Sequence, residues 1–365
     1  MIAEVGNSQR TGYTASKIFH MRRHEPDAYA TASTFFLVHN FINWHLTGGP
    51  AGGVAVMEPG DASGMALWHP GPGVWSRKVM DVMDPGLPGK LPPLGPSDRS
   101  IGALDPALAS RFGLSPECRI DAGSGDNQYG AVGTGNIAPG IVTVSLGTSG
   151  TAYTVLEEPF IDSTGEIAAF RDSTGHHLPL LCVSNLANGY DGLREEFDLS
   201  HHQFDELYFR STPGSGGRLI IPWYEGERTP DLPQAAPLNF GFGPSDFCPE
   251  VLCRAMVEGH VLNLHDGFTR LPVTPGEIRL TGGLSNSPAW CQAIADIFGA
   301  DTVPVRGEGA ALGAAIPAAW VWFREGGRDQ TLAEVSGPFV VLEESARCKP
   351  DPAHREVYDL LSRIY

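Results

Sequence analysis

Two aspartates and three glycines lie within ten positions of the sequence, in the stretch DAGSGDNQYG at residues 121–130. Residues of these types can do two kinds of chemistry. The glycines could let backbone amides close around a phosphate or a cofactor, as in dinucleotide- and methyl-donor-binding loops. Alternatively, they could give Asp126 the clearance to face a substrate as a catalytic carboxylate. The surrounding sequence has to distinguish these two hypotheses.

The cofactor hypothesis lacks its usual companions. Such a loop follows a hydrophobic strand and precedes, by about twenty positions, an acidic residue that holds ribose hydroxyls. The lead-in SPECRI has hardly any strand character, and no Asp or Glu occurs from Asn127 to Leu156. We therefore interpret Asp126 as a carboxylate that faces a substrate. His39 and the pair His176–His177 are alternative bases, although each is better interpreted as a packing or surface histidine.

Three other glycine-bearing stretches follow in a suggestive order. The turn SLGTSG (145–150) could offer backbone amides and the hydroxyls of Thr148 and Ser149 to a phosphate. The turn LTGG (280–283) leads into a helix, where a nucleotide could lie against bare backbone. The stretch GEGAALGAAI (307–316) lets a helix approach a neighbour closely. Arg228, in GERTP, could contact a phosphate or the sugar, or it could form an interdomain ion pair.

In this order the motifs resemble those of FGGY-type carbohydrate kinases, and the resemblance covers nearly the whole chain. GDASGM and the TGYTASK loop favour the xylulokinase branch of that family. The motifs that carry the resemblance are TGYTASK (11–17), HNFINWHLTG (39–48), GDASGM (60–65), GSGDN (123–127), VSLGTSG (144–150), LLCVSN with LANGYDGLREE (180–196), GERTP (226–230), LTGGLSNSPAWCQAIADIFG (280–299) and GEGAALGAA (307–315).

The resemblance implies an α/β fold of the actin-like ATPase (ribonuclease H-like) kind, with ATP and sugar in a cleft between two lobes. It implies that Asp126 is the general base that takes a proton from a sugar hydroxyl, and that Asn127 contacts the sugar. Leu284 departs from the small residue that is common at its position in the family. The implied ATP-binding residues are Gly147, Thr148 and Ser149 near the phosphates, and Gly282, Gly283 and Ser287 near the adenosine.

The implied reaction is the ATP- and Mg²⁺-dependent conversion of D-xylulose to D-xylulose 5-phosphate. Phosphoryl transfer needs alignment and charge neutralisation more than covalent catalysis, so backbone donors, Mg²⁺ and one carboxylate suffice. Two alternatives remain. The chain could be an FGGY kinase for another sugar or polyol, such as ribulose, gluconate or glycerol. It could also be a truncated, inactive fragment that binds nucleotide or a partner subunit.

The second alternative arises because the family's opening segment has no counterpart here. Relatives begin with a D-x-G-T hairpin, which serves the first phosphate and Mg²⁺, and later carry a Met-His pair. This sequence has no D-x-G-T, and Asp121 could not easily take over that role. We therefore expect an incomplete N-terminal, sugar-binding lobe at residues 1–138 and a C-terminal, nucleotide-binding lobe at residues 139–365.

Several elements must position these motifs. A helix is predicted over residues 26–46, and β-branched residues around GTSG predict a hairpin over 140–156. DSTG occurs twice, at 162–165 and 172–175, which predicts a β-meander with two similar turns. A short strand, IRL, leads to a helix with Ser287 as N-cap, Pro288 at its first position and Gly299 as C-cap. Another amphipathic helix has a buried face made of Val257, Val261, Leu264 and Phe268.

Composition limits the partners. The 365 residues include 25 basic and 42 acidic residues, and the net charge of −17 argues against nucleic acid or an anionic membrane as the main partner. The N-terminus is too polar for a signal peptide, and TFFLVHNFINWHL is too short to span a bilayer. Six scattered cysteines predict free thiols and a cytoplasmic protein. The resemblance also allows a homodimer, because relatives are often dimers.

Overall fold

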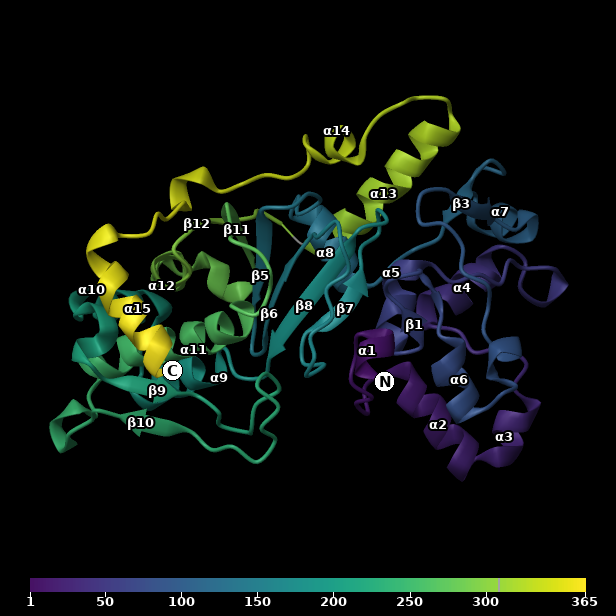
Figure 1. The fold of residues 1–365 in the computed structure, drawn as a ribbon. Helices are drawn as coiled ribbons and strands as arrows, with labels where there is room; N and C mark the ends of the chain where they lie inside the picture. The colour runs from purple at the N-terminus through teal and green to yellow at the C-terminus, as the bar shows by residue number, and fades with distance from the viewer. Residues whose placement is uncertain (308) are drawn as a thin grey trace. The chain divides into compact units, whose positions relative to one another are not determined.

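The computed structural model describes residues 1–307 and 309–365, which fall into two compact units (Figure 1). Each unit is assembled from segments that lie far apart in the sequence. The first comprises Met1–Ile137, Val155–Pro179 and Glu308–Phe339, and the second comprises Ala138–Thr154, Leu180–Gly307 and Val340–Tyr365. The lobes expected at 1–138 and 139–365 stay a prediction. Glu308, in the GEGAALGAA motif, lies outside the described residues.

The first unit has an apolar core beneath its N-terminal helices. Val5, Met57, Met65, Leu67 and Leu87 in this core are all 0% exposed, and burial of a large apolar side chain contributes about 1.5–3 kcal/mol. The helices of this unit are α1 (Ile2–Val5), α2 (Thr14–His24), α3 (Pro26–Thr31), α4 (Val38–Leu46), α5 (Pro59–Ala62), α6 (Arg77–Met83), α7 (Pro106–Phe112), α8 (Asp126–Gly133), α13 (Gly309–Glu325) and α14 (Leu332–Ser336). Its strands are β1 (Trp68–His69), β2 (Val74–Trp75), β3 (Ser100–Ala103), β4 (Arg119–Asp121) and β7 (Ala168–Arg171).

Two glycine-bearing helices of the first unit, α8 and α13, lie side by side (Figure 1). A β-carbon on Gly133 of α8 would stand 1.7 Å from the carbonyl oxygen of Gly309 in α13. The two backbones approach this closely because neither glycine carries a side chain. The expectation that GEGAALGAAI allows a helix to pack closely against a neighbour is therefore confirmed.

The single helix expected over residues 26–46 is wrong, because two helices stand there, α3 and α4, with an extended segment between them. The ammonium group of Lys90 donates a hydrogen bond to the carbonyl oxygen of Tyr29 (3.1 Å), in the last turns of α3. A cation that binds the final carbonyl groups stabilises a helix end. Lys90 is remote in sequence, so this contact could not be predicted locally, although the run TAST at residues 31–34 is itself a loop signal.

The lead-in to the DAGSGDN loop also differs from expectation. β4 is a short strand, although little strand character was predicted, and it pairs antiparallel with β3. Hydrogen bonds with β3 satisfy the backbone N–H and C=O groups of β4, although the side chains of SPECRI do not predict a strand. A two-stranded antiparallel pair is not the parallel strand that precedes a dinucleotide-binding loop. The interpretation of the loop therefore does not change.

The sheet of the second unit has the strand order β12–β11–β5–β6–β8. β5 and β6 form the predicted hairpin, and β11 is parallel to both β5 and β12. β8 is antiparallel to β6, with Val183 opposite Gly150. As a result β5, β8 and β11 run in one direction and end at the same edge of the sheet. The strands are β5 (Ile141–Leu146), β6 (Gly150–Thr154), β8 (His177–Val183, which begins in the first unit), β9 (Leu219–Ile221), β10 (Leu238–Phe240), β11 (Glu277–Thr281) and β12 (Asp301–Pro304).

Helices pack around this sheet much as the sequence predicts. The predicted apolar face of α11 is at most 4% exposed. In α12, the Ser287 hydroxyl accepts a hydrogen bond from the Trp290 amide, and Gly299 closes the helix with φ +69°. Both helix predictions are confirmed. The helices are α9 (Asn188–Glu196), α10 (His201–Arg210), α11 (Pro249–Phe268), α12 (Pro288–Phe298) and α15 (Arg355–Ile364).

The two DSTG stretches form similar turns, as predicted, but the predicted β-meander is wrong, because β6 pairs with β8 and not with β7, the next strand in the sequence. Asp162 and Asp172 each accept a hydrogen bond from the hydroxyl of the threonine two residues later, at 2.6 and 2.5 Å. Asp162 also binds the amide of Ile167, just before β7 (3.1 Å), and Asp172 binds the amide of His176, just before β8 (2.7 Å). Each aspartate thus orders the turn that leads into the next strand.

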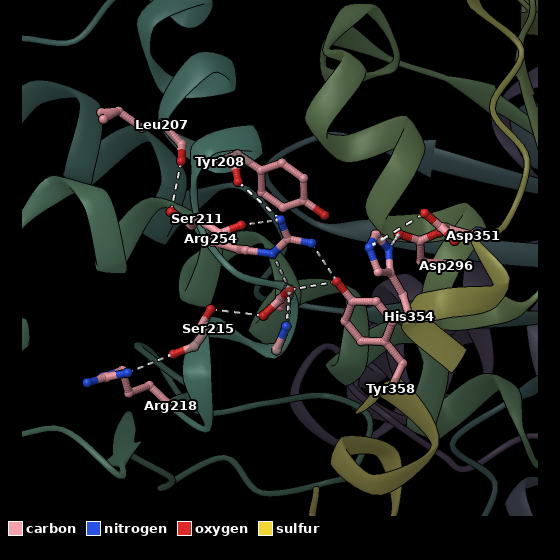
Figure 2. Close-up of polar contacts among 12 residues, drawn as sticks. Leu207, Tyr208, Ser211, Ser215, Arg218, Arg254, Asp296, Asp351, His354 and Tyr358 are labelled. Carbon is pink, nitrogen blue, oxygen red and sulfur yellow. Dashed lines mark hydrogen bonds and ion pairs between the residues drawn. The ribbon is translucent and has the colours of Figure 1, made fainter. Parts of the chain in front are cut away.

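A buried polar network joins α11 to α15 in the second unit (Figure 2). The Glu258 carboxylate accepts hydrogen bonds from Arg254 Nε (2.7 Å), Tyr358 Oη (2.7 Å) and Ser215 Oγ (2.9 Å). The guanidinium group of Arg254 lies over the ring of Tyr208, 4.3 Å from its centroid. Buried charges that are paired and hydrogen-bonded in this way fix the relative position of the elements that carry them.

Candidate active site

Asp126 is the first residue of α8 and directly follows the glycine-rich loop. Its side chain is exposed, and its Oδ1 accepts hydrogen bonds from the backbone N–H (2.8 Å) and the side-chain amide (2.9 Å) of Asn127. The N-terminal end of a helix favours a negative charge at this position. One oxygen of the carboxylate is thus fixed by Asn127, and the group as a whole faces outward, as a proton acceptor must.

The loop before Asp126, residues 121–125, is held on one side by α4. The side-chain amide of Asn43 donates to two successive backbone carbonyl oxygens of the loop, at 3.2 and 3.0 Å. Gly123 has φ +81°, and a β-carbon on it would stand 2.8 Å from Cδ2 of His39. Glycine is required here both by the left-handed backbone and by the imidazole ring beside it.

The other side of the loop is formed by the GDASGM motif. The Gln128 side chain donates to the carbonyl oxygen of Gly60 (3.0 Å). A β-carbon on Gly125 would stand 3.2 Å from Oδ1 of Asp61. The second oxygen of this carboxylate, Oδ2, lies 3.1 Å from Nδ1 of His39. The two walls of the loop are therefore linked to each other by a histidine–aspartate pair.

Two further carboxyl groups near the loop are buried. Glu58 caps α5 by accepting hydrogen bonds from two backbone N–H groups, but burial still raises its pKa to about 8. Burial likewise raises the pKa of Asp121 to about 6, although its side chain accepts a hydrogen bond from the Ala122 amide. At neutral pH Glu58 is therefore largely protonated, whereas Asp121 is largely charged.

In the second unit, three loops lie at the edge where β5, β8 and β11 end. They are residues 147–149, 184–187 and 282–287. Two backbone amides of the middle loop donate to the carbonyl oxygen of Thr148 (3.0 and 3.2 Å). A β-carbon on Gly282 would stand 2.4 Å from the carbonyl oxygen of Leu146. The predicted phosphate turn and the predicted GG turn are thus neighbours in this unit, and Gly147, Thr148, Ser149, Gly282 and Gly283 are all exposed.

Glu227, in the GERTP stretch, organises the middle loop. Its carboxylate is 3% exposed and accepts hydrogen bonds from the backbone amides of Ser184 (2.5 Å) and Asn185 (3.3 Å). It also binds the side-chain amide of Asn263 in α11 (2.8 Å). A carboxylate with several N–H donors is a strong local anchor, because each bond is charge-assisted. Glu227 therefore fixes the end of β8 and the entry to α9.

The GG turn is anchored through Ser287. The Ser287 hydroxyl donates to Oδ1 of Asp205 in α10 (2.5 Å). Burial raises the pKa of Asp205, and the bond from Ser287 opposes that shift. A cavity of about 660 Å³ opens beside this contact, a volume within the range of small-molecule sites. It is lined by His201, His202, Asp205, Glu206, Phe209, Arg210, Asn286 and Pro288.

The remaining candidates lie elsewhere. Leu284 is 9% exposed, so its side chain turns into the core and leaves the exposed edge free. Arg228 is exposed, and its Nη1 donates to Sγ of Cys182 (2.9 Å) in the second unit. Nδ1 of His176 lies 2.8 Å from the Thr174 hydroxyl in the second DSTG turn, and burial lowers the pKa of His177 to about 4. Neither histidine contacts Asp126 in the described chain.

The next two observations concern metal ions and membranes. Across residues 1–307 and 309–365, no three His, Cys, Asp or Glu side chains gather closely enough to form a metal cage. Within the same two ranges, none of the helices combines the length and the apolar character that a membrane crossing requires. All six cysteines are free thiols.

Comparison with known proteins decides the family. Residues 1–133 match the N-terminal domain, and residues 142–322 the C-terminal domain, of the FGGY family of carbohydrate kinases. A xylulose kinase from Haemophilus influenzae is 35% identical over 348 residues, which cover 94% of this chain and 69% of that protein. The chain belongs to the FGGY family of carbohydrate kinases. Another member, a xylulose kinase from Bacillus subtilis, is 28% identical over 97% of this chain and 70% of its own length.

Solved structures of the family share the fold. The xylulose kinase from Bifidobacterium adolescentis superposes with a TM-score of 0.85 at 27% identity, over 99% of this chain and 74% of that one. The ligand-bound xylulose kinase from Lactobacillus acidophilus gives a TM-score of 0.89 at 21% identity, over 99% of this chain and 72% of that one. The predicted α/β fold of the actin-like ATPase kind is confirmed, and so is the prediction of a carbohydrate kinase.

Three features near the candidate residues were not found by sequence reasoning. They are the His39–Asp61 pair, the hydrogen bonds of Glu227 and the contact between Asp205 and Ser287. Asp61 lies in the GDASGM motif and Glu227 in the GERTP motif, but neither is among the predicted site residues. For Glu227, which is 3% exposed, the available signal was the acid itself, because a buried carboxylate must find hydrogen-bond donors.

Proposed function

We propose that this FGGY kinase transfers the γ-phosphoryl group of ATP to a hydroxyl of D-xylulose, which gives D-xylulose 5-phosphate and ADP. The observation that carries the proposal is the 35% identity to a xylulose kinase over 94% of the chain. The exposed carboxylate of Asp126 at the start of α8 supports it independently, because a sugar kinase needs a base within reach of solvent and substrate.

Asp126 acts as the general base in this proposal. It accepts the proton of the sugar hydroxyl as that oxygen attacks the γ-phosphorus, and the bond from the γ-phosphorus to the β–γ bridging oxygen breaks to release ADP. The proton stays on the Asp126 carboxyl until the product leaves. Asn127 holds one oxygen of Asp126 and contacts the sugar with the rest of its amide.

The nucleotide binds to the second unit in this proposal. Gly147, Thr148 and Ser149 offer exposed backbone N–H groups and hydroxyls to the phosphates. Gly282, Gly283 and Ser287 support the adenosine, with the cavity beside Asp205 as space for it. Mg²⁺ arrives with the nucleotide as Mg-ATP and is part of the substrate, since it usually binds through phosphate oxygens and water. We also keep the cytoplasm as the proposed compartment, because the reaction consumes ATP.

The direct test is ATP turnover with D-xylulose, compared with ribulose, gluconate and glycerol. D-xylulose should give the highest kcat/KM, and the Asp126→Asn variant should lose at least about 10²-fold in kcat while it keeps the same fold. A higher kcat/KM for one of the other compounds would replace D-xylulose as the substrate. Undiminished turnover by Asp126→Asn would remove Asp126 as the base. Binding of ATP without turnover of any sugar would favour a nucleotide-binding fragment over a kinase.

A further inference from the structure

The loop that carries Asp126 has little of its own to hold it in place. Between the backbone carbonyls bound by Asn43 and the start of α8 stand only Gly123, Ser124 and Gly125. Two of these three residues have no side chain, and Gly123 has a left-handed backbone. Glycine gives a chain the widest choice of backbone conformations. The orientation of the loop must therefore be set by what stands on either side of it.

The two sides are closed by one contact. His39, in the first turn of α4, stands beside Gly123, and Asp61, in α5, stands beside Gly125. Nδ1 of His39 lies 3.1 Å from Oδ2 of Asp61. Both side chains are part-buried, at 24% and 33% exposure, so the pair is shielded from full competition by water. The loop is thus enclosed between His39 and Asp61, and we call this pair the clamp.

The ring of His39 is fully engaged in this arrangement. Its Nε2 lies 2.9 Å from the side-chain amide of Asn40, which is 1% exposed. In the tautomer that satisfies both contacts, Nδ1–H donates to Asp61 and Nε2 accepts from Asn40. With both ring nitrogens occupied, His39 has no free lone pair for a substrate proton. The earlier alternative, in which His39 is itself the base, is not favoured by this geometry.

We propose that His39 and Asp61 are positioning residues, which hold the 121–125 loop so that Asp126 meets the sugar hydroxyl in line with the γ-phosphate. This inference rests on the proposed function of Asp126. Its physical basis is that a misplacement of about 1 Å at a reacting group can cost about 10²-fold in rate, even when the cause lies away from the chemistry. The pair should therefore affect kcat much more than sugar affinity.

Three substitutions of His39 separate its two contacts. The amide nitrogen of an asparagine takes roughly the place of Nδ1, so His39→Asn keeps a donor for Asp61. The amide of a glutamine lies roughly where Nε2 lies, so His39→Gln keeps only the contact with Asn40. His39→Ala removes both. We expect kcat to fall about 10- to 100-fold in His39→Ala and His39→Gln, with the sugar KM changed less than about 3-fold, whereas His39→Asn stays close to the unsubstituted chain.

A matched control exists in the second unit, where Nδ1 of His354 lies 2.9 Å from Oδ2 of Asp296. His354→Ala removes the same kind of pair and should lower the melting temperature without lowering kcat. If His39→Ala and His39→Gln keep full kcat, or if His39→Asn loses as much kcat as His39→Gln, the positioning role is overturned. Should His39→Ala not fold, the comparison of Gln with Asn decides.

A second measurement keeps this inference separate from the proposed function. Hydrogen exchange of the backbone amides of residues 122–127 reports on the loop without any turnover. It should be faster in His39→Gln than in His39→Asn, and unchanged in His354→Ala. If the unsubstituted chain phosphorylates no sugar, the proposed function fails, and hydrogen exchange alone then judges the clamp. Equal exchange in the Gln and Asn variants would overturn it.

Discussion

The carbonyl oxygen of Tyr129 in α8 lies 1.6 Å from the point that a β-carbon on Gly313 of α13 would occupy. A non-bonded carbon atom cannot stand that close to an oxygen, so the two helices are in contact backbone to backbone. Because α8 begins with Asp126, the packing of α13 also sets where the proposed base stands.

Gly313→Ala should therefore disturb both the stability and the activity of the protein. The added methyl group forces α13 away from α8, and overpacking of this kind costs about 1–3 kcal/mol in the free energy of unfolding. We expect a lower urea midpoint together with a lower kcat. Gly192→Ala is the control, because Gly192 is also helical but has nothing within 4 Å of an added β-carbon. Alanine there should leave stability unchanged or raise it by about 0.5–1 kcal/mol. Equal effects of the two substitutions would contradict the close packing.

Asp121 makes stability depend on pH. Burial raises its pKa to about 6 in the folded chain, against about 3.9 when the chain is unfolded. Near pH 3 the residue is protonated in both states. As pH rises from about 4 to 6, the unfolded chain ionises this carboxyl group while the folded chain keeps it protonated, so the folded chain loses stability relative to an Asp121→Asn variant, which does not titrate; above pH 6 the loss no longer grows. At pH 8 the variant should be the more stable by up to about 3 kcal/mol, most of this difference should already be present at pH 6, and it should be small near pH 4.

Urea unfolding at pH 4, 6 and 8 checks this sign. Asp84→Asn provides a control of the opposite direction, since the hydrogen bond from Tyr29 lowers the pKa of Asp84. Asp84 stabilises the folded chain above the pKa of the unfolded state, and this contribution is lost as pH falls. A stability gain for Asp121→Asn that is the same at every pH would show that its carboxyl group is not perturbed.

Ser287 should serve both the helix and the nucleotide. Ser287→Ala removes the cap of α12, which costs about 1 kcal/mol, and leaves Asp205 without its hydroxyl donor. We expect a lower melting temperature and a several-fold higher KM for ATP, with the sugar KM unchanged. Ser287→Thr keeps the hydroxyl group and should restore most of both. If the KM for ATP is unaffected in Ser287→Ala, Ser287 only caps α12 and does not support nucleotide binding.

Glu258 should be among the least replaceable residues of the second unit. Glu258→Ala leaves the guanidinium group of Arg254, 4% exposed, without its charge partner, and an unpaired buried charge costs about 3–5 kcal/mol. Tyr358→Phe removes only one hydroxyl from the same network and should cost about 1–3 kcal/mol. Chemical unfolding of both variants measures the two losses in the free energy of unfolding. A Glu258→Ala variant as stable as Tyr358→Phe would mean that water reaches Arg254.

Local signals in the sequence predicted local structure well. Helix α12 begins and ends where predicted, with Ser287 and Pro288 at its start and Gly299 at its end, because capping depends on neighbouring backbone groups. The hairpin of β5 and β6 followed from β-branched residues on both sides of a glycine turn. Asp126 was predicted to lie in a loop, whereas it is the first residue of helix α8, directly after the loop.

Contacts between distant segments were beyond prediction. Lys90 binds a carbonyl oxygen in the last turns of α3, and the residues around Thr31 do not encode that contact. His39 and Asp61 belonged to two separate motifs whose spacing carries no sign of their contact. The same holds for Glu227, whose amide donors come from the loop after β8 and from α11. Each of these contacts depends on tertiary packing, which a periodic pattern does not encode.

The partnership of α8 with α13 has a consequence for how the protein is made. α8 ends at Gly133, but the helix that covers it, α13, is not fully translated until the ribosome has passed residue 325. Until then the glycine-lined surface of α8 has no helix to cover it, and a nascent chain must hold its N-terminal part in an unfinished state through most of synthesis. For the same reason, a gene split after codon 138 would yield two polypeptides, each of which lacks the other's helix. Such halves should be recovered only when they are co-expressed.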